Sequence, residues 1–340
     1  MREAEVFAYE VLQDSVRLWR CFSYDKRAQL PEILEGLPVT ELAPYSFSRH
    51  MDAKELPVLA SAGRLRYGTR DGQAWTEERQ LPPELCGLEL EAVSLPSGLQ
   101  KIGRYAFYNC NGLKRLSFYS SLSDLGSGLF TGCHHVGELA VRIVEGKPSC
   151  FQAILSELVE ELRVDYYEKG QYCRLVFPEF FEEGGEDTPA RNTKVIVHGS
   201  GMRFRNCFKE KRFQFGWYDE RFDQARFLEK PELTLELALE RLMHPLELSE
   251  HGRRTYEAYV RQHLLEAGIW MLENKETKAL VWLLETTDFA GAAEFTEAVT
   301  PQLLEQLTEA ARKKQRTEAV SYLMDLKHRK FRPKAKNFDL

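Results

Sequence analysis

The chain has 340 residues, with 46 basic and 52 acidic side chains and a formal net charge of −6 at pH 7. This acidic balance argues against a protein that binds nucleic acid over its whole surface, since such proteins are usually basic. The length is sufficient for two domains. No apolar run approaches the roughly 18 residues of a membrane span, so we expect no membrane association.

The cysteines and the start of the chain indicate the compartment. Seven cysteines, an odd number, form no Cys-x-x-Cys pair and no regular disulfide framework, which favours a reducing environment. The first residues carry acidic side chains where a secretory signal needs basic ones, and they lack a continuous apolar core. We therefore expect a cytoplasmic protein.

The N-terminal stretch predicts a hairpin. Residues 6–12 and 16–22 are rich in apolar side chains and flank a turn-prone segment at 13–15. A hairpin with polar edges can cap a stack of repeated units, which needs such a cap for solubility. We expect this hairpin to lie at the first turn of the repeats that follow.

The next stretch looks like a first repeat followed by an interruption. Leu42, Ser46 and Phe47 occupy the same columns as residues 102, 106 and 107, and a strand is expected near Leu56–Val58. From residue 60 to 79 the pattern fails, and polar residues and glycines take over. This segment is either a degenerate repeat or an inserted loop, and long inserted loops often carry function.

Residues 95–141 repeat themselves. The residues Ile102, Gly103, Ala106, Phe107, Cys110, Leu113, Leu116 and Phe118 correspond to Leu125, Gly126, Leu129, Phe130, Cys133, Val136, Leu139 and Val141, each pair 23 apart. A period of this length predicts stacked units of the leucine-rich class, in which each unit buries its apolar face against the next. The Cys110 column is expected to be structural, because buried free cysteines behave as small apolar residues.

The run LPSGLQKIGRYAFYNCNGLKRLSF resembles the BspA-like leucine-rich repeats of bacteria. The resemblance is close over residues 95–141 and looser elsewhere in the first two hundred residues. It implies a horseshoe of short parallel strands with irregular outer segments, and it implies no enzymatic activity. Such repeats often belong to exported surface proteins, so a surface adhesin remains an alternative if an export signal precedes this sequence.

Further units are expected after the clear pair. Val159, Leu162 and Val164 continue the spacing of 23 from residues 136, 139 and 141, and a last strand is expected at Lys194–Val197. The acidic, glycine-containing stretch 182–192 is expected to form a loop on one edge.

Residues 201–230 form an aromatic and basic segment. It interleaves the cations Arg203, Arg205, Lys209, Lys211 and Arg212 with the aromatic residues Phe204, Phe208, Phe213, Phe215 and Trp217. Such interleaving can bind single-stranded nucleic acid by base stacking and phosphate pairing. The alternative, which we favour, is a junction whose aromatic rings anchor it to the domains on either side.

After Pro231 the pattern becomes helical. Leu235, Leu239 and Leu242 share one helix face that Pro245 should end, and Ser249 is expected to cap a helix that runs through Leu265. Residues 300 and 301 fit the start of another helix, to Arg312. A weaker repeat with a period of 40 relates residues 277–284 to 317–324 and resembles the paired helices of ankyrin repeats.

The sequence shows no constellation typical of catalysis. His134 and His135 have no second ligand cluster at metal spacing, and residues 126–132 deviate from a phosphate-binding glycine loop. We expect no enzyme, no cofactor and no metal site.

We predict an α+β protein with a leucine-rich-repeat solenoid at 1–200, a junction at 201–230, a helical domain at 231–331 and a basic tail at 332–340. Its function is expected to be non-enzymatic binding of a protein partner through the concave strand face, with an undetermined oligomeric state. If residues 116, 139 and 162 point inward, the alternate residues form outward rows. The candidate contacts on these rows are Arg115, Tyr119, Arg142, Arg163 and Asp165.

Overall fold

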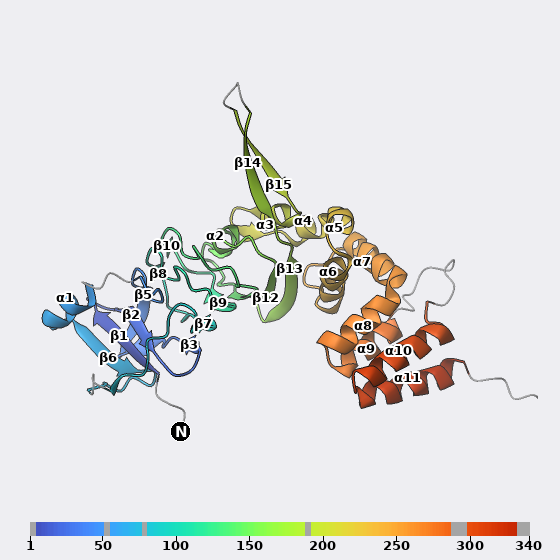
Figure 1. Cartoon of the computed structure of the whole chain (residues 1–340), viewed down its shortest axis with the longest axis horizontal. Coiled ribbons are helices and arrows are strands. Elements are labelled where there is room, and N and C mark those ends of the chain that lie inside the picture. Colours follow the sequence, from blue (N-terminus) through green and yellow to red (C-terminus); the bar gives the residue numbers. More distant parts are fainter. Residues whose placement is uncertain (1–4, 51–54, 77–79, 188–191, 287–297, 332–340) are drawn as a thin grey trace, which may run out of the picture. The chain divides into compact units, whose positions relative to one another are not determined.

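A computed structural model describes residues 5–50, 55–76, 80–187, 192–286 and 298–331. The chain forms two compact units, Met1–Glu229 and Lys230–Leu340, called here the N-terminal unit and the C-terminal unit (Figure 1). None of the described helices is long and apolar enough to cross a membrane. The basic tail expected at 332–340 lies outside the described residues.

The N-terminal unit is built on two sheets whose strands come from successive turns of the chain. The seven-stranded sheet has the order β10-β8-β5-β2-β1-β6, with β4 beside β5, and the six-stranded sheet has the order β13-β12-β11-β9-β7-β3. The first contains β1 (Val6–Val11), β2 (Val16–Phe22), β4 (Ile33–Leu34), β5 (Leu37–Leu42), β6 (Leu65–Thr69), β8 (Lys101–Ile102) and β10 (Asp124–Leu125). The second contains β3 (Arg27–Gln29), β7 (Ala92–Ser94), β9 (Arg115–Tyr119), β11 (Glu138–Arg142), β12 (Leu162–Glu168) and β13 (Gln171–Phe177).

The predicted N-terminal hairpin is confirmed, and it begins the stack of turns. β1 and β2 pair antiparallel, and β2 then pairs parallel with β5, the first strand of the repeat series in that sheet. The strand expected near Leu56–Val58 is wrong, because these residues lie in helix α1 (Glu55–Ser61). Leu56 and Leu59 are one helical turn apart and both pack on Trp19, which a strand would not allow. The region 60–79, expected to be either a degenerate repeat or an inserted loop, contributes β6, which pairs antiparallel with β1.

The stacking of equivalent residues is confirmed. The rings of Phe47, Phe107 and Phe130 stack in series, with centroids 5.4 and 5.6 Å apart. Leu116 on β9 faces Leu139 on β11 in parallel register, and both are fully buried. The structural role expected for the cysteine column is also confirmed, since the Cys133 thiol donates to the carbonyl oxygen of Phe107 at 2.9 Å.

The spacing of 23 does not extend to the next strand. Leu139 lies opposite Val164 on β12, a difference of 25 (164 − 139), rather than opposite Leu162 as predicted. The connection between these strands contains the short helix α2 (Phe151–Ser156), whose buried Phe151, Ile154 and Leu155 take up chain that the earlier turns do not have. The outward rows therefore shift by two residues at this strand.

The repeat series ends after β12. β13 pairs antiparallel with β12, which stops the parallel stacking. The loop expected at 182–192 is wrong. The strand expected at 194–197 is confirmed, but it does not belong to the solenoid. Described parts of these segments form β14 (Phe181–Asp187) and β15 (Asn192–His198), an antiparallel hairpin that projects as the two long strands in Figure 1 and belongs to neither main sheet.

The aromatic segment after this hairpin packs into the end of the N-terminal unit. It forms helix α3 (Gly201–Arg205), the strand pair β16 (Phe208–Lys209) and β17 (Arg212–Phe213), and helices α4 (Phe215–Glu220) and α5 (Phe222–Leu228). The ring of Phe213 contacts those of Phe151, Tyr166 and Phe177 at centroid distances of 5.9, 6.1 and 6.1 Å. These rings form the terminal core of the solenoid.

The C-terminal unit is helical. Its described helices are α6 (Pro231–Met243), α7 (Glu250–Gln262), α8 (Leu264–Asn274), α9 (Thr277–Thr286), α10 (Pro301–Lys313) and α11 (Thr317–Lys330). The Ser249 and Thr300 side chains cap α7 and α10 by accepting from Gly252 N at 3.0 Å and Leu303 N at 3.1 Å. The helix expected through Leu265 instead ends at Gln262, since the backbone leaves the helical conformation at His263.

The 40-residue repeat corresponds to real helices, because α9 and α11 begin at its two copies, Thr277 and Thr317. The resemblance to ankyrin repeats stays a prediction, since helix pairs are common to several repeat families.

Candidate functional site

The outward face of the six-stranded sheet carries the predicted contact residues. In β9 and β11, Leu116 and Leu139 point to the core, so the residues on either side of them point outward. The register places three outward rows across the strands. The rows are Ala92, Arg115, Glu138 and Arg163; then Ser94, Ser117, Ala140 and Asp165; then Tyr119, Arg142 and Tyr167.

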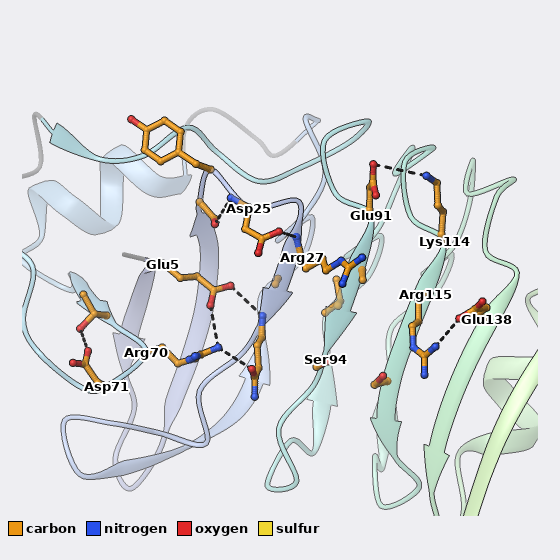
Figure 2. Close-up of a pocket in the computed structure, with 18 of the residues that line it drawn as sticks. Glu5, Asp25, Arg27, Arg70, Asp71, Glu91, Ser94, Lys114, Arg115 and Glu138 are labelled. Atoms are coloured by element: carbon orange, nitrogen blue, oxygen red, sulfur yellow. Dashed lines mark hydrogen bonds and ion pairs between the residues drawn. The ribbon is translucent and has the colours of Figure 1, made fainter. Parts of the chain in front are cut away.

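A groove of about 1740 Å³ lies over part of this face. Its floor includes the small residues Ser94 and Ser117, and its walls come from β3, the turns before β7 and β9, and the segment 69–75 after β6. Figure 2 shows Arg70 and Asp71 on one side of the groove and Arg115 with Glu138 on the other. A long polar groove with a small-residue floor can accept an extended segment of another protein.

The charges that line the groove are balanced and mostly paired. Glu91 lies between Lys26 and Lys114, with N···O distances of 3.3 and 3.7 Å, and these cations lower the pKa of Glu91. At the opposite wall, the Glu5 carboxylate accepts from the backbone of Gln29 at 3.0 Å and lies 3.8 Å from Arg70, while burial raises the pKa of Glu5. This alternation of signs suits a polar protein surface better than a polyanion.

Asp165 lies at the centre of an ion-pair network. Its two carboxylate oxygens accept from Arg115 and Arg174, each at 2.9 Å, and from the Tyr172 hydroxyl at 2.9 Å. Burial and the neighbouring Asp165 carboxylate raise the pKa of Tyr172, which therefore stays a neutral hydrogen-bond donor. Arg115 also pairs with Glu138 at 2.6 Å. The network fixes side chains of the four strands β9, β11, β12 and β13 in one arrangement.

Arg142 lies in a different environment from these arginines. Its guanidinium carbon is 5.8 Å from the ring centroid of Tyr119 and 5.0 Å from that of Tyr167, so the cation lies between two aromatic rings. Tyr167 in turn contacts Tyr172, with centroids 5.2 Å apart. The arginine is exposed, while the three tyrosines are partly buried.

The five predicted contact residues all lie on this sheet, but they fall into separate environments. Arg115 and Arg163 line the groove. Tyr119 and Arg142 form the aromatic stack beside it. Asp165, only 7% exposed, is held within the ion-pair network and orients its neighbours. The spacing of 23 predicts that Asp165 shares an outward row with Tyr119 and Arg142. The observed register places Asp165 in the row of Ala140 and Ser117 instead.

Several residues of this surface were missed by the sequence analysis. Arg27 and Arg70 reach the groove from β3 and from the turn after β6, which lie outside the clear repeat. Tyr167 joins the stack because the register at β12 is shifted by two. A spacing of 25 between apolar pairs, Leu139 with Val164 and Val141 with Tyr166, was the signal that could have revealed this shift.

The comparison with protein families agrees with this geometry. Residues 85–158 match the BspA type leucine rich repeat region, in six copies. The N-terminal unit thus has a leucine-rich-repeat solenoid. No curated protein and no solved structure matches the chain. The solenoid contributes β7, β9 and β11 to the six-stranded sheet, so the repeat turns themselves form the middle of the candidate surface.

In the basic segment, four of the five aromatic rings on which the nucleic-acid alternative depends are buried. Phe204, Phe208, Phe213 and Phe215 are at most 9% exposed, which leaves no faces on which bases could stack, and only Trp217 of the predicted set is exposed. Arg205 is also buried, and its guanidinium donates to the backbone oxygens of Leu158 at 2.8 Å and Glu160 at 2.5 Å. This segment therefore closes the solenoid rather than presenting a binding face.

No group of three or more metal-ligating side chains is present among the described residues. All seven cysteines are buried and free. Burial raises the pKa of Cys110 and Cys150 to about 12 and that of Cys133 and Cys207 to about 11, so these thiols are poor nucleophiles at neutral pH.

Proposed function

We propose that the N-terminal unit is a non-enzymatic recognition module that binds a protein partner on the outward face of the six-stranded sheet. The observation that carries this proposal is the groove of about 1740 Å³, because it crosses several strands and is lined by polar side chains with a small-residue floor. Leucine-rich-repeat solenoids commonly bind through such a strand face.

The chemistry of the groove supports binding rather than catalysis. Most of its ionisable residues are arranged in opposite-charge pairs, and a catalytic site usually needs a group held in an unusual protonation state or an activated nucleophile. We further propose a reducing, cytoplasmic location, since the seven cysteines are unpaired. Fractionation of the native cell tests the location.

A groove-filling variant tests the binding proposal. Ser94 is exposed on β7, so Ser94→Trp should fill the floor of the groove without disturbing the core. Lys101→Trp is the matched control, since Lys101 is exposed on β8 in the other sheet. Wild type, variant and control are immobilised, and proteins retained from a native lysate are compared by mass spectrometry.

We expect one set of proteins to be retained by wild type and by Lys101→Trp and lost on Ser94→Trp, with circular dichroism of the three proteins unchanged. Equal retention on all three would place any binding outside the groove and would contradict the proposal.

A further inference from the structure

Arg142 is a cation of the recognition face that contacts aromatic rings and has no carboxylate partner among the described residues. Arg115, Arg163 and Arg174, on β9, β12 and β13, each lie within 3 Å of a carboxylate oxygen, at 2.6, 2.7 and 2.9 Å. No carboxylate of the described residues lies within 4.0 Å of the Arg142 guanidinium. Its contacts are the rings of Tyr119 and Tyr167 instead.

The two rings prepare Arg142 for a specific interaction. An exposed arginine normally loses side-chain entropy when it is fixed. Stacking between two partly buried tyrosines restricts the guanidinium before any ligand binds. The planar fork of arginine carries several N–H donors, and no described residue accepts a hydrogen bond from the Arg142 guanidinium, so these donors are available to an incoming group.

A carboxylate fits this cation better than a phosphate does. The fork of arginine matches the two oxygens of a carboxylate in a bidentate pair. Sites for phosphorylated segments usually use clusters of arginines, whereas the arginines on the neighbouring strands of this face are already paired with Glu138, Glu161 and Asp165. In the described part of the chain, no second unneutralised arginine lies on the strands next to Arg142, so this place on the face suits one negative charge.

The surroundings of Arg142 leave room for the chain that carries the carboxylate. The adjacent outward row begins with Ser94 and Ser117, which line the groove, and continues with the buried Ala140 and Asp165. Strands lie about 4.8 Å apart, so crossing the five strand intervals of the sheet takes about 24 Å, or roughly seven residues of extended chain. A side chain of such a segment can reach Arg142 while its backbone lies on the small-residue row.

We propose that Arg142, clamped between Tyr119 and Tyr167, anchors an Asp or Glu side chain of an extended protein segment that lies in the groove over Ser94 and Ser117. This inference rests on the proposed function and adds the chemistry of the partner. Asp165 and Arg115 act as positioning residues, because their network fixes the strands beside the stack.

Selection from a random heptapeptide library displayed on phage tests this proposal on the full chain. Peptides selected on wild type should carry Asp or Glu at one fixed position. Selection on Arg142→Gln should lose this preference, and selection on the charge-reversed Arg142→Glu should replace it with Lys or Arg. Arg104→Gln is the matched control, since Arg104 is exposed outside the six-stranded sheet, and it should keep the acidic preference.

A selected acidic peptide is then synthesised, and its affinity is measured by fluorescence anisotropy. Arg142→Gln should raise Kd at least tenfold. Replacing the acidic residue of the peptide by its amide should raise Kd by the same factor, and the two changes together should add little to either alone.

The results separate this inference from the proposed function. If Ser94→Trp abolishes binding of the selected peptides but the peptides show no acidic preference, the role of Arg142 is contradicted and groove binding is still supported. Peptides that bind Ser94→Trp as tightly as wild type, or a library that yields no binder, would contradict both.

Discussion

Arg20 and Glu157 cap opposite ends of one series of backbone hydrogen bonds between turns, Arg20 as a donor and Glu157 as an acceptor. In this series an N–H of each turn donates to a carbonyl of the next turn, so the first turn keeps free carbonyls and the last keeps free N–H groups. Arg20, 4% exposed, donates to the carbonyl oxygens of Ser46 at 3.2 Å and Ser48 at 2.7 Å. The Glu157 carboxylate is hydrogen-bonded by the backbone of Phe130 and Leu129. A donor side chain therefore ends the acceptor side, and an acceptor side chain ends the donor side.

Replacing Glu157 tests this cap. Glu157→Leu leaves two N–H groups of the last turn without an acceptor and should lower the free energy of unfolding by about 1–3 kcal/mol. Glu157→Gln keeps an acceptor oxygen and should restore most of the loss near neutral pH. Urea unfolding of the full chain, followed by the circular dichroism of the sheets, gives both values. Equal losses in the two variants would contradict the role as an acceptor.

The same cap has a defined pH dependence. Burial raises the pKa of Glu157 above 4.5, and the hydrogen bonds from Phe130 and Leu129 offset only part of this shift. The folded state therefore holds the proton more tightly than the unfolded chain does. The part of the stability that depends on this proton is present below pH 4.5 and is lost as the pH rises through the folded pKa, whereas the hydrogen bonds from Phe130 and Leu129 remain. The stability difference between wild type and Glu157→Gln should fall over that range.

Arg205 should be essential for the C-terminal end of the solenoid. Its guanidinium donates to backbone oxygens of Leu158, Glu160, Pro178 and Gly201, and burial lowers its pKa to about 10, so it stays charged at neutral pH. Arg205→Met leaves these oxygens without their donor, and we expect a loss of at least about 3 kcal/mol. Arg203→Met is the matched control two residues away, exposed and bonded to Gln224, with an expected change under about 0.5 kcal/mol. Similar stability of the two variants would show that the cap is dispensable.

The phenylalanine stack should dominate the stability of the repeat core. Phe107 is fully buried between Phe47 and Phe130, so Phe107→Ala removes both ring contacts and leaves a cavity. We expect a loss of about 3–5 kcal/mol in the free energy of unfolding, measured in urea. Phe227, 84% exposed in the same unit, provides the control, and its change to Ala should have almost no effect.

The ion-pair network should respond unequally to loss of its two acids. Asp165→Asn removes the charge shared by Arg115 and Arg174, and we expect a loss of about 2 kcal/mol, less than for a fully buried pair because Arg115 is 41% exposed. Glu138 is 44% exposed, so Glu138→Gln should cost under about 1 kcal/mol. Thermal unfolding at low and high salt measures both. A larger loss for Glu138→Gln would place the centre of the network elsewhere.

The cysteine thiols should not react with thiol reagents in the folded protein. All seven cysteines are buried, and burial raises the pKa of Cys110 to about 12. At pH 8 a chromogenic disulfide reagent should label none of them in native protein and all seven after denaturation. Rapid labelling of any thiol before unfolding would reveal local opening of the solenoid, and the modified cysteine would locate it.

The sequence alone determined the repeating core, because equivalent residues of successive turns pack against one another in a solenoid. Phe107 over Phe130 and Leu116 beside Leu139 follow directly from the spacing of 23. The helical unit and the caps at Ser249 and Thr300 also followed from the sequence, because helix formation and capping depend on residues close together in the chain.

Only the tertiary structure decided which polar residues face a partner and which hold the fold. Arg142 and Arg205 are the same residue type in the sequence. One is exposed between two tyrosines, while the other is buried against four carbonyls. The role of Arg205 depends on the backbone carbonyls that the last turn leaves without a donor. The role of Arg142 depends on the two extra residues before β12, which bring Tyr167 beside it. Both features arise only when distant segments of the chain come together.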